Sequence, residues 1–169
     1  SPLQSFQASP QFTSAPGREQ YNMITVPRGG EFTLILSDGT QVWLNAETSL
    51  RYPVEFVGNE RKVYLEGEAF FDVTHDKQKQ FVVETEKAKV QVYGTAFNVY
   101  AYPNEYEVAA TLVRGAIDLK ERGSGNRIQL EPGEHRIKAV FVNDYGIRSE
   151  TVENYYLIDV AIPEKPEVT

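Results

Sequence analysis

The sequence predicts an all-β fold, either a sandwich or a β-helical, jelly-roll-like barrel, with about ten short strands and glycines at the corners. Val, Ile, Thr, Tyr and Phe are frequent, and these residues suit a pleated, half-buried surface. Apolar residues recur with a period of two, and no segment sustains a period of 3.6. Apolar residues make up 41% of the chain, which is enough for a substantial core.

The first predicted hairpin begins with the alternating apolar positions of residues 32–36. Asp38-Gly39 follows, and this dipeptide is a strong signal for a two-residue hairpin turn. In the return strand, Trp43 points to the opposite side from its two apolar neighbours. Residues 45–49 then indicate a turn, and Pro53 limits strand pairing because it lacks an N–H donor.

Eight further strands follow along the chain, separated by turn signals such as the 121–126 loop and Pro132-Gly133. We expect them at residues 62–73, 81–84, 88–92, 97–102, 106–112, 117–119, 128–130 and 137–142. The strand at 137–142 is the last clear one.

Glycines follow short apolar runs at a loose interval. They are Gly39, Gly67, Gly94, Gly115 and Gly133, and a new run starts after each of them. Because glycine accepts a positive φ, we expect these positions to form corners or bulges of a winding sheet. The intervals are too uneven for a strict solenoid.

The chain divides into three parts. Residues 1–20 are rich in Pro, Ser and Gln and indicate a flexible linker, residues 21–150 form the predicted β domain, and residues 151–169 form a tail or linker. The net charge of -7 and the pI near 4.9 argue against nucleic acid and anionic lipid as partners. The absence of cysteine excludes disulfides and thiol catalysis.

No catalytic, cofactor-binding or metal-binding residue is predicted. His75 and His135 are the only histidines and do not form a His-x-His pair, so a cupin-type metal site is a poor match. Glu66, Glu68 and Asp72 are the nearest approach to paired catalytic carboxylates, but a solvated face or a turn contact explains them better. The motifs G-x-S-x-G and G-x-x-x-x-G-K-[ST] are absent, and the Arg28-Gly29-Gly30 segment fits an ordinary turn better than an anion nest.

Ten tyrosines leave a second reading open. Tyr93, Tyr100, Tyr102 and Tyr106 are close together in the chain, and exposed tyrosines occur both at protein interfaces and at sugar-binding sites. Ordinary half-buried strand positions explain them as well. A carbohydrate-binding β-sandwich module is therefore the alternative to a protein-interaction domain, and an enzyme is the least favoured class.

Five blocks of the sequence, taken in order, resemble the FecR family of anti-sigma factors. PRGGEFTLILSDGTQVWLNAETSLRYP, residues 27–53, is similar to the family's opening signature. RKVYLEGEAFFDV at 61–73 resembles its second block, and FVVET with VQVYGTAFNVYAY, within 81–102, resembles its third. TLVRGAIDL and LEPGE complete the order, so that the resemblance covers about residues 21–142.

This resemblance implies a periplasmic sensor domain of a single-pass inner-membrane protein, in a Bacteroidetes-like branch. Its expected partner is the signalling domain of an outer-membrane TonB-dependent transporter. A cytoplasmic segment absent from this chain would bind an ECF sigma factor, and the inner-membrane anchor would lie outside it too. The resemblance implies protein-protein contact and no enzyme activity.

The last part of the chain departs from the resemblance, since residues 153–169 do not match the segment expected there. Their apolar run, made of Tyr155, Tyr156, Leu157 and Ile158, is the predicted partner-binding segment. An open sheet edge has unpaired N–H and C=O groups, and we expect partner recognition by strand addition at such an edge, with this run as a candidate donor.

Overall fold

The computed structural model describes residues 19–105, 107–122, 127–130, 136–142 and 146–152. These residues form thirteen strands and no helix. The strands are β1 (Tyr21–Thr25), β2 (Phe32–Ile35), β3 (Gln41–Leu44), β4 (Ser49–Pro53), β5 (Glu60–Asp72), β6 (Gln80–Glu84), β7 (Ala88–Val92), β8 (Ala96–Ala101), β9 (Glu107–Arg114), β10 (Ile117–Glu121), β11 (Arg127–Leu130), β12 (Arg136–Val142) and β13 (Gly146–Val152).

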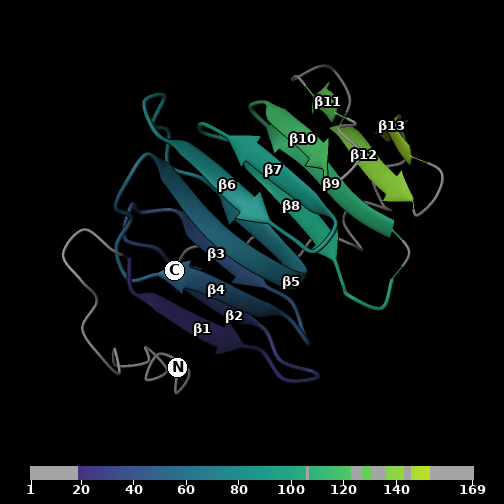
Figure 1. The fold of residues 1–169 in the computed structure, drawn as a ribbon. Coiled ribbons are helices and arrows are strands. Elements are labelled where there is room, and N and C mark those ends of the chain that lie inside the picture. Colours follow the sequence, from purple (N-terminus) through teal and green to yellow (C-terminus); the bar gives the residue numbers. More distant parts are fainter. Residues whose placement is uncertain (1–18, 106, 123–126, 131–135, 143–145, 153–169) are drawn as a thin grey trace.

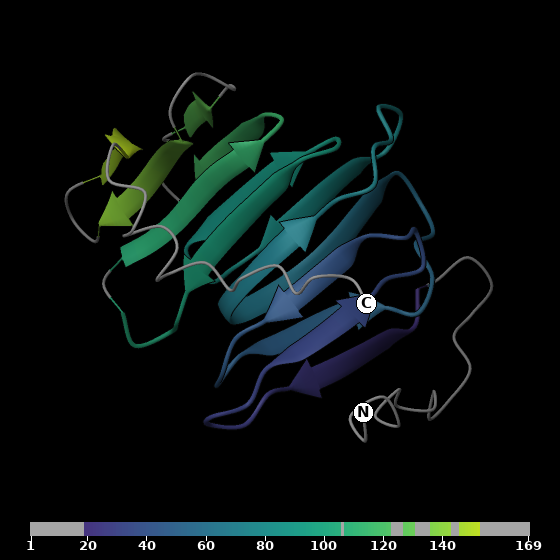
Figure 2. The same cartoon turned by 180° about the vertical axis from the view of Figure 1, so that it is seen from behind.

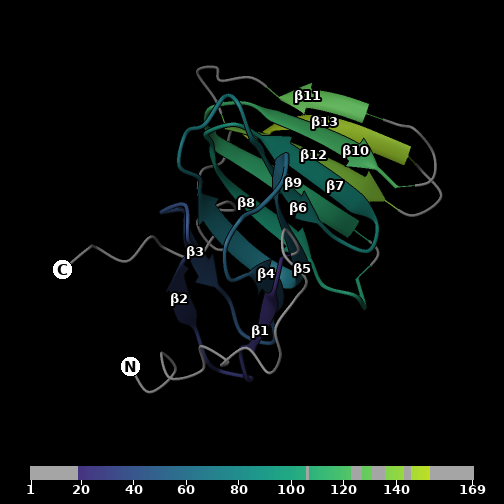
Figure 3. The same ribbon diagram turned by 60° about the vertical axis from the view of Figure 1, so that its left-hand side comes forward.

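The strands form two layers that face each other (Figures 1 and 3). Sheet A has the order β1-β4-β5-β6-β7-β10-β11, and sheet B has the order β2-β3-β5-β8-β9-β12-β13. The β5–β6 pair is parallel, while the other pairs in the described residues are antiparallel. The fold is therefore a sandwich of mixed pairing that does not close into a barrel.

Strand β5 belongs to both sheets because it changes partners half-way along. Its first part pairs with β4 and β6 in sheet A, and the part from Gly67 onward pairs with β3 and β8 in sheet B. Gly67 has φ +120°, and a Cβ built there would lie 2.7 Å from the Cα of Thr48. Only glycine fits this bend, where both the backbone angle and the close approach exclude a side chain.

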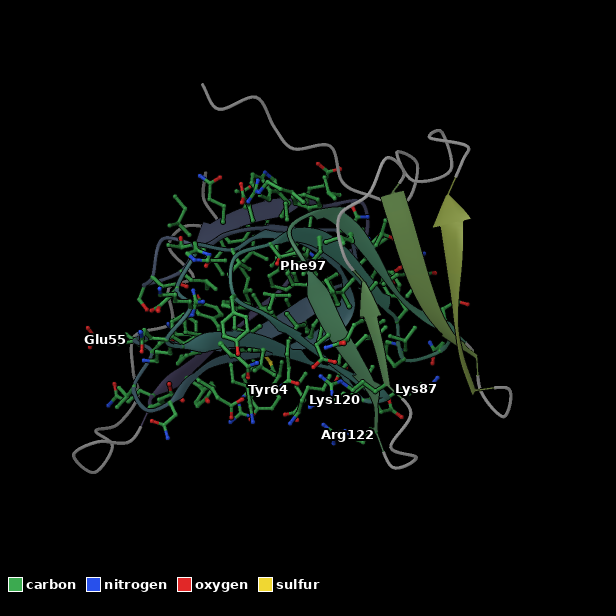
Figure 4. The ribbon with its side chains drawn as sticks, turned by 90° about the horizontal axis from the view of Figure 1, so that it is seen from above. Glu55, Tyr64, Lys87, Phe97, Lys120 and Arg122 are labelled. Carbon is green, nitrogen blue, oxygen red and sulfur yellow. The ribbon has the colours of Figure 1, made fainter. Side chains whose placement is uncertain are left out.

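The core lies between the two inner faces, where alternate residues of β1 to β10 meet. Phe71 of β5 stacks on Phe97 of β8 with ring centroids 5.3 Å apart, and Phe71 also contacts Phe81 of β6. Figure 4 places Phe97 between the layers, whereas Lys120 and Arg122 lie outside sheet A. Burial of this apolar set is the main driving force for folding.

The expected all-β sandwich is confirmed, and the ten strands foreseen all occur. Three more strands exist: β1, β4 and β13. The sequence signal for β1 was weak because only Ile24 of that strand is buried. Strand β4 was missed because Pro53 was given too much weight; it sits at the strand's last position, where it pairs with Tyr21 and little pairing is lost.

The glycine prediction is right for three positions and wrong in its reason for a fourth. Gly39, Gly67 and Gly115 have positive φ values of 90°, 120° and 92°. Gly94 does not; a Cβ there would lie 2.8 Å from the Cα of His75, so close backbone approach requires glycine at this position. Gly133 lies outside the described residues.

Candidate functional site

A buried polar cluster lies where the turn after β3 meets the bend of β5. Its centre is Glu68, whose side chain is on the outer face of sheet B and whose residue is only 4% exposed. The Nδ2 atoms of Asn45 and Asn98 donate hydrogen bonds to the two carboxylate oxygens at 2.7 and 2.8 Å. Each carboxylate oxygen is thus bound by an amide from a different strand or turn.

The backbone around Glu68 is held in place by the same turn. The Glu68 N–H donates to Thr48 Oγ1 at 3.0 Å, and the Asn45 N–H donates to the Glu68 carbonyl at 3.0 Å. Tyr102 Oη donates to the carbonyl of Ala46 at 2.7 Å. The cluster therefore fastens the 45–48 turn to β5 and to the end of β8.

Burial raises the pKa of the Glu68 carboxyl above its usual range, while the hydrogen bonds from Asn98 and Asn45 act in the opposite direction. Desolvation is the larger effect. A carboxyl with a raised pKa in a pocket can act as a general acid. Here both oxygens already accept hydrogen bonds from the protein, which favours a role in holding the corner.

A second polar centre surrounds Arg61, which is 2% exposed. Its Nη1 lies 2.8 Å from Asp38 Oδ2 and donates to the Thr74 carbonyl at 2.7 Å. Its Nε donates to the Lys79 carbonyl at 2.8 Å, and Nη2 donates to the Tyr93 carbonyl at 3.1 Å. One guanidinium therefore links the β2–β3 turn, the β5–β6 loop and the end of β7, which uses the fork geometry that lysine lacks.

The outer faces of the two sheets differ in character. On sheet A that face carries long polar side chains such as Lys62, Gln91 and Lys120, all of them partly exposed. On sheet B a separate apolar cluster of Trp43, Phe70 and Ala96 is buried. The rings of Trp43 and Phe70 meet edge to face at 5.7 Å. Figure 2 shows this face turned toward the viewer, with no described strand in front of it.

Comparison with known proteins identifies the relationship. The family model described as FecR protein matches residues 22–118, which is more than half of the chain. The chain belongs to the FecR family. No match was found among the curated proteins.

Two solved structures resemble this FecR chain closely. Both are crystal structures of a "putative anti-sigma factor" from Parabacteroides distasonis, at 1.65 and 2.50 Å resolution. Each is 36% identical to this chain, with TM-scores of 0.71 and 0.72 over 77% and 78% of it. This chain spans 59% and 60% of the length of those two chains.

Two of the motifs that resemble the FecR family lie at the two polar centres. The Asp38-Gly39 turn supplies the carboxylate partner of Arg61, and Asn45 and Thr48 supply two of the partners of Glu68. The sequence left a solvated face and a turn contact open for Glu68. The solvated face is wrong because the residue is buried, and the turn contact is right because Asn45 and Thr48 bind Glu68. Arg61 was not identified from the sequence. The available signal for Arg61 was a charged residue on the strand face that alternation assigns to the core, because a buried charge requires partners.

The other carboxylates and the histidines considered in the sequence do not come together in one site. Glu66 is exposed on sheet A, while Asp72 is on sheet B, where Arg114 Nη2 lies 2.8 Å from its Oδ1. Within the described residues no cluster of three or more metal-ligating side chains occurs. In the same residues no helix has the length and apolar character needed to cross a membrane. His75 is exposed; His135 lies outside the described residues.

The tyrosines of the FecR domain are engaged within the fold. Tyr100 and Tyr102 meet edge to face at 5.1 Å, and Tyr93 Oη accepts a hydrogen bond from Gln80. Burial, followed by the charge of Glu105, raises the pKa of Tyr100 to about 12. Tyr106 lies outside the described residues, as do the predicted partner-binding residues Tyr155, Tyr156, Leu157 and Ile158.

Proposed function

We propose that this chain is the periplasmic sensor part of an anti-sigma factor. In this role it relays the state of an outer-membrane TonB-dependent transporter to an ECF sigma factor by protein-protein contact. The observation that carries the proposal is membership of the FecR family together with 36% identity to a structure described as a "putative anti-sigma factor". The transporter, the sigma factor and the inner-membrane anchor are all part of the proposal.

A non-enzymatic role is supported by how the buried charged groups are used. Glu68 and Asp38 accept hydrogen bonds from protein side chains, and Arg61 donates hydrogen bonds to backbone carbonyls and to Asp38. Groups committed in this way stabilise a scaffold and leave its surface to recognise a partner.

The strand-addition mechanism has a suitable edge in β2. Within the described chain β2 pairs with β3 alone, so its other edge presents backbone N–H and C=O groups. Ile35 of this strand is 63% exposed, which is unusual for an isoleucine. A partner strand that pairs with β2 would gain main-chain hydrogen bonds and an apolar contact with Ile35.

Titration calorimetry with purified signalling domains of TonB-dependent transporters from the same organism tests the proposal. Ile35→Lys places a charge on the β2 edge and should weaken binding at least tenfold, because edge lysines oppose strand pairing. The matched control is Met23→Lys, at an equally exposed position on β1, the edge of sheet A. Equal effects of the two variants would remove β2 as the docking edge, and no binding by the unaltered chain would reject the transporter as the partner.

A sigma-dependent reporter in cells tests the wider role. Removing residues 21–150 from the full-length protein should uncouple sigma activity from the transporter's inducer. A reporter response that keeps its full induction ratio would contradict a sensor function for this domain.

A further inference from the structure

The outer face of sheet B is buried although no described strand packs on it. Four side chains form a row across neighbouring strands: Trp43 on β3, Phe70 on β5, Asn98 on β8 and Thr111 on β9. They are between 2% and 7% exposed. Neighbours in a sheet flank a side chain but do not cover its outer end, so a row of this kind requires something above it.

Sheet A provides the internal comparison. Its outer row, with Lys62, Gln91 and Asp118, stays partly exposed, as expected for a face in contact with solvent. Val82 is buried there, but it is a short side chain between the long side chains of Lys62 and Gln91. Trp43 is the largest side chain of its own row, so flanking cannot explain its burial.

The extent of the buried row indicates the direction of the cover. Burial holds from Thr111 to Trp43 and stops at the next position, Thr33 on β2, which is exposed. Ile35, also on β2, is exposed as well. The covering segment therefore reaches β3 but does not extend over β2, as expected for a segment that crosses from the β13 side.

Register places the end of β13 close to this row. Thr111 pairs with Lys138 of β12, and Lys138 pairs with Glu150 of β13. Strand β13 ends at Val152, only two residues beyond the row. The chain after Val152 therefore begins beside the face that needs a cover.

Length and composition both suit the segment that follows. Crossing from β13 to β3 takes five strand spacings, which is about 24 Å. Residues 153–169 could span on the order of 55 Å when extended. Their sequence contains YYLIDVAI at residues 155–162, in which every residue except Asp159 is apolar or aromatic. Residues 1–18 are dominated by Ser, Pro, Gln and other small or polar residues.

Residues 1–18 also join the domain at a different place. Just after them, Glu19 accepts a hydrogen bond from the Val57 N–H, and Gln20 accepts one from the Val54 N–H. These contacts hold the start of the described chain at the β1–β4 end of sheet A. A segment entering there would have to pass around the edge of the sandwich to reach the Trp43 row.

Asn98 supplies an additional point of attachment. Its Nδ2 is used by Glu68, but its Oδ1 accepts no hydrogen bond from any residue that the structure describes. A buried amide oxygen without a donor is costly, so a donor on the covering segment is expected. A backbone N–H or a tyrosine hydroxyl of residues 153–169 would satisfy it.

We propose that residues 153–169 lie across the outer face of sheet B and cover the row from Thr111 to Trp43, with the apolar run 155–162 against Trp43 and Phe70. The FecR sandwich is thereby completed by a third layer formed from its own C-terminal segment. The predicted partner-binding residues Tyr155 to Ile158 then act first as an intramolecular cover, and a partner that needs them has to displace them. This proposal stands without the transporter contact proposed above.

Trp43 is the chain's only tryptophan, so its fluorescence reports on this face alone. In the full chain, the variant Leu157→Asp/Ile158→Asp should shift its emission to longer wavelength and raise acrylamide quenching several-fold. The matched control is Met23→Asp/Val54→Asp, at exposed apolar positions near the edge of sheet A, and it should leave both readings unchanged. Far-UV circular dichroism of each variant establishes that the sheets have formed.

A disulfide scan tests the same contact without destabilising the domain. The chain has no cysteine, so Thr111→Cys combined with a cysteine at each position from 155 to 160 reports proximity directly. At least one pair should oxidise to a monomeric disulfide, while the same series with Lys89→Cys on sheet A should not. No disulfide in the Thr111 series, together with unchanged Trp43 fluorescence in the aspartate variant, would overturn the proposal.

Two other outcomes would assign the cover to a different occupant and also overturn it. Deleting residues 1–18 would expose Trp43 if the N-terminal segment were the cover. Quenching that increases on dilution, with a matching dimer in sedimentation, would identify a second copy of the chain.

Discussion

Replacing Gly67 with alanine should be among the most destabilising changes available in this chain. Gly67 has φ +120°, a conformation nearly restricted to glycine, and forcing another residue into it costs about 1–3 kcal/mol. A Cβ there would also meet the Cα and Cβ of Thr48 at 2.7 and 2.8 Å. These are atoms of a turn that is held by hydrogen bonds, so relief requires backbone movement at about 1–3 kcal/mol.

Movement of the turn would also weaken the hydrogen bond from the Glu68 N–H to Thr48 Oγ1, which is worth about 1 kcal/mol. We therefore expect Gly67→Ala to reduce the free energy of unfolding by roughly 3–7 kcal/mol, a large share of the 5–15 kcal/mol typical of a domain. Urea denaturation measures the loss as a lower midpoint at unchanged slope.

Gly58→Ala is the matched control for this prediction. Gly58 also has a positive φ, of 90°, but a Cβ there would meet nothing within 4 Å. It should cost about 1 kcal/mol, which is backbone strain alone. If Gly67→Ala were no more destabilising than Gly58→Ala, the close approach of the 45–48 turn to β5 would be wrong, and with it the account of the corner.

Three further changes test the polar centres and the core. Arg61→Lys should reduce the free energy of unfolding by about 3 kcal/mol in urea denaturation, because an ammonium cannot replace the guanidinium fork in a buried site. Arg114→Lys, in an exposed ion pair, is the control and should change stability by less than about 0.5 kcal/mol. Equal losses would refute the Arg61 centre. The raised pKa of Glu68 stabilises the fold at low pH, and this contribution to the free energy of unfolding is lost as pH rises through the folded-state pKa. Glu68→Gln should therefore flatten the dependence of stability on pH above about 4.3, the ordinary pKa of a Glu side chain. An unaltered pH profile would contradict the shift. Phe97→Ala should cost about 3–5 kcal/mol by opening a cavity beside Phe71, whereas Tyr93→Ala, at a position that is 46% exposed, should cost less than about 1 kcal/mol. Thermal unfolding would rank the two variants, and the reverse order would contradict the core assignment.

The two polar centres explain why a domain without a recognised reactive site contains buried charge. Arg61 lies near the start of β5 and Glu68 lies just after its bend at Gly67, and each fixes a turn to the strand that both sheets share. Breaking either centre would leave a buried charge or polar group without its partner, which is more costly than the net gain from forming it. For the proposed sensor role they provide a rigid scaffold with defined edges.

Alternation along the chain was sufficient to predict the sandwich and the faces of its strands. Trp43 was placed opposite its neighbours from periodicity alone, and it does lie on the outer face of sheet B. Gly39, Gly67 and Gly115 were correctly expected at positive φ. These features are local, since a two-residue period and a single backbone angle are properties of a few adjacent residues.

Three features could not be obtained from the sequence. They are the sharing of β5 between two sheets, the burial of Glu68 and Arg61, and the burial of the row from Thr111 to Trp43. Each depends on contacts between residues far apart in the chain, such as Asn45 and Asn98 with Glu68, or Asp38 and Tyr93 with Arg61. Composition and periodicity tell which side chains a strand presents, but the free energy of burying a charge is set by the partners that the tertiary fold brings to it. The sequence alone therefore determined the class of fold and the side of each strand, and the tertiary structure decided which of those sides are covered.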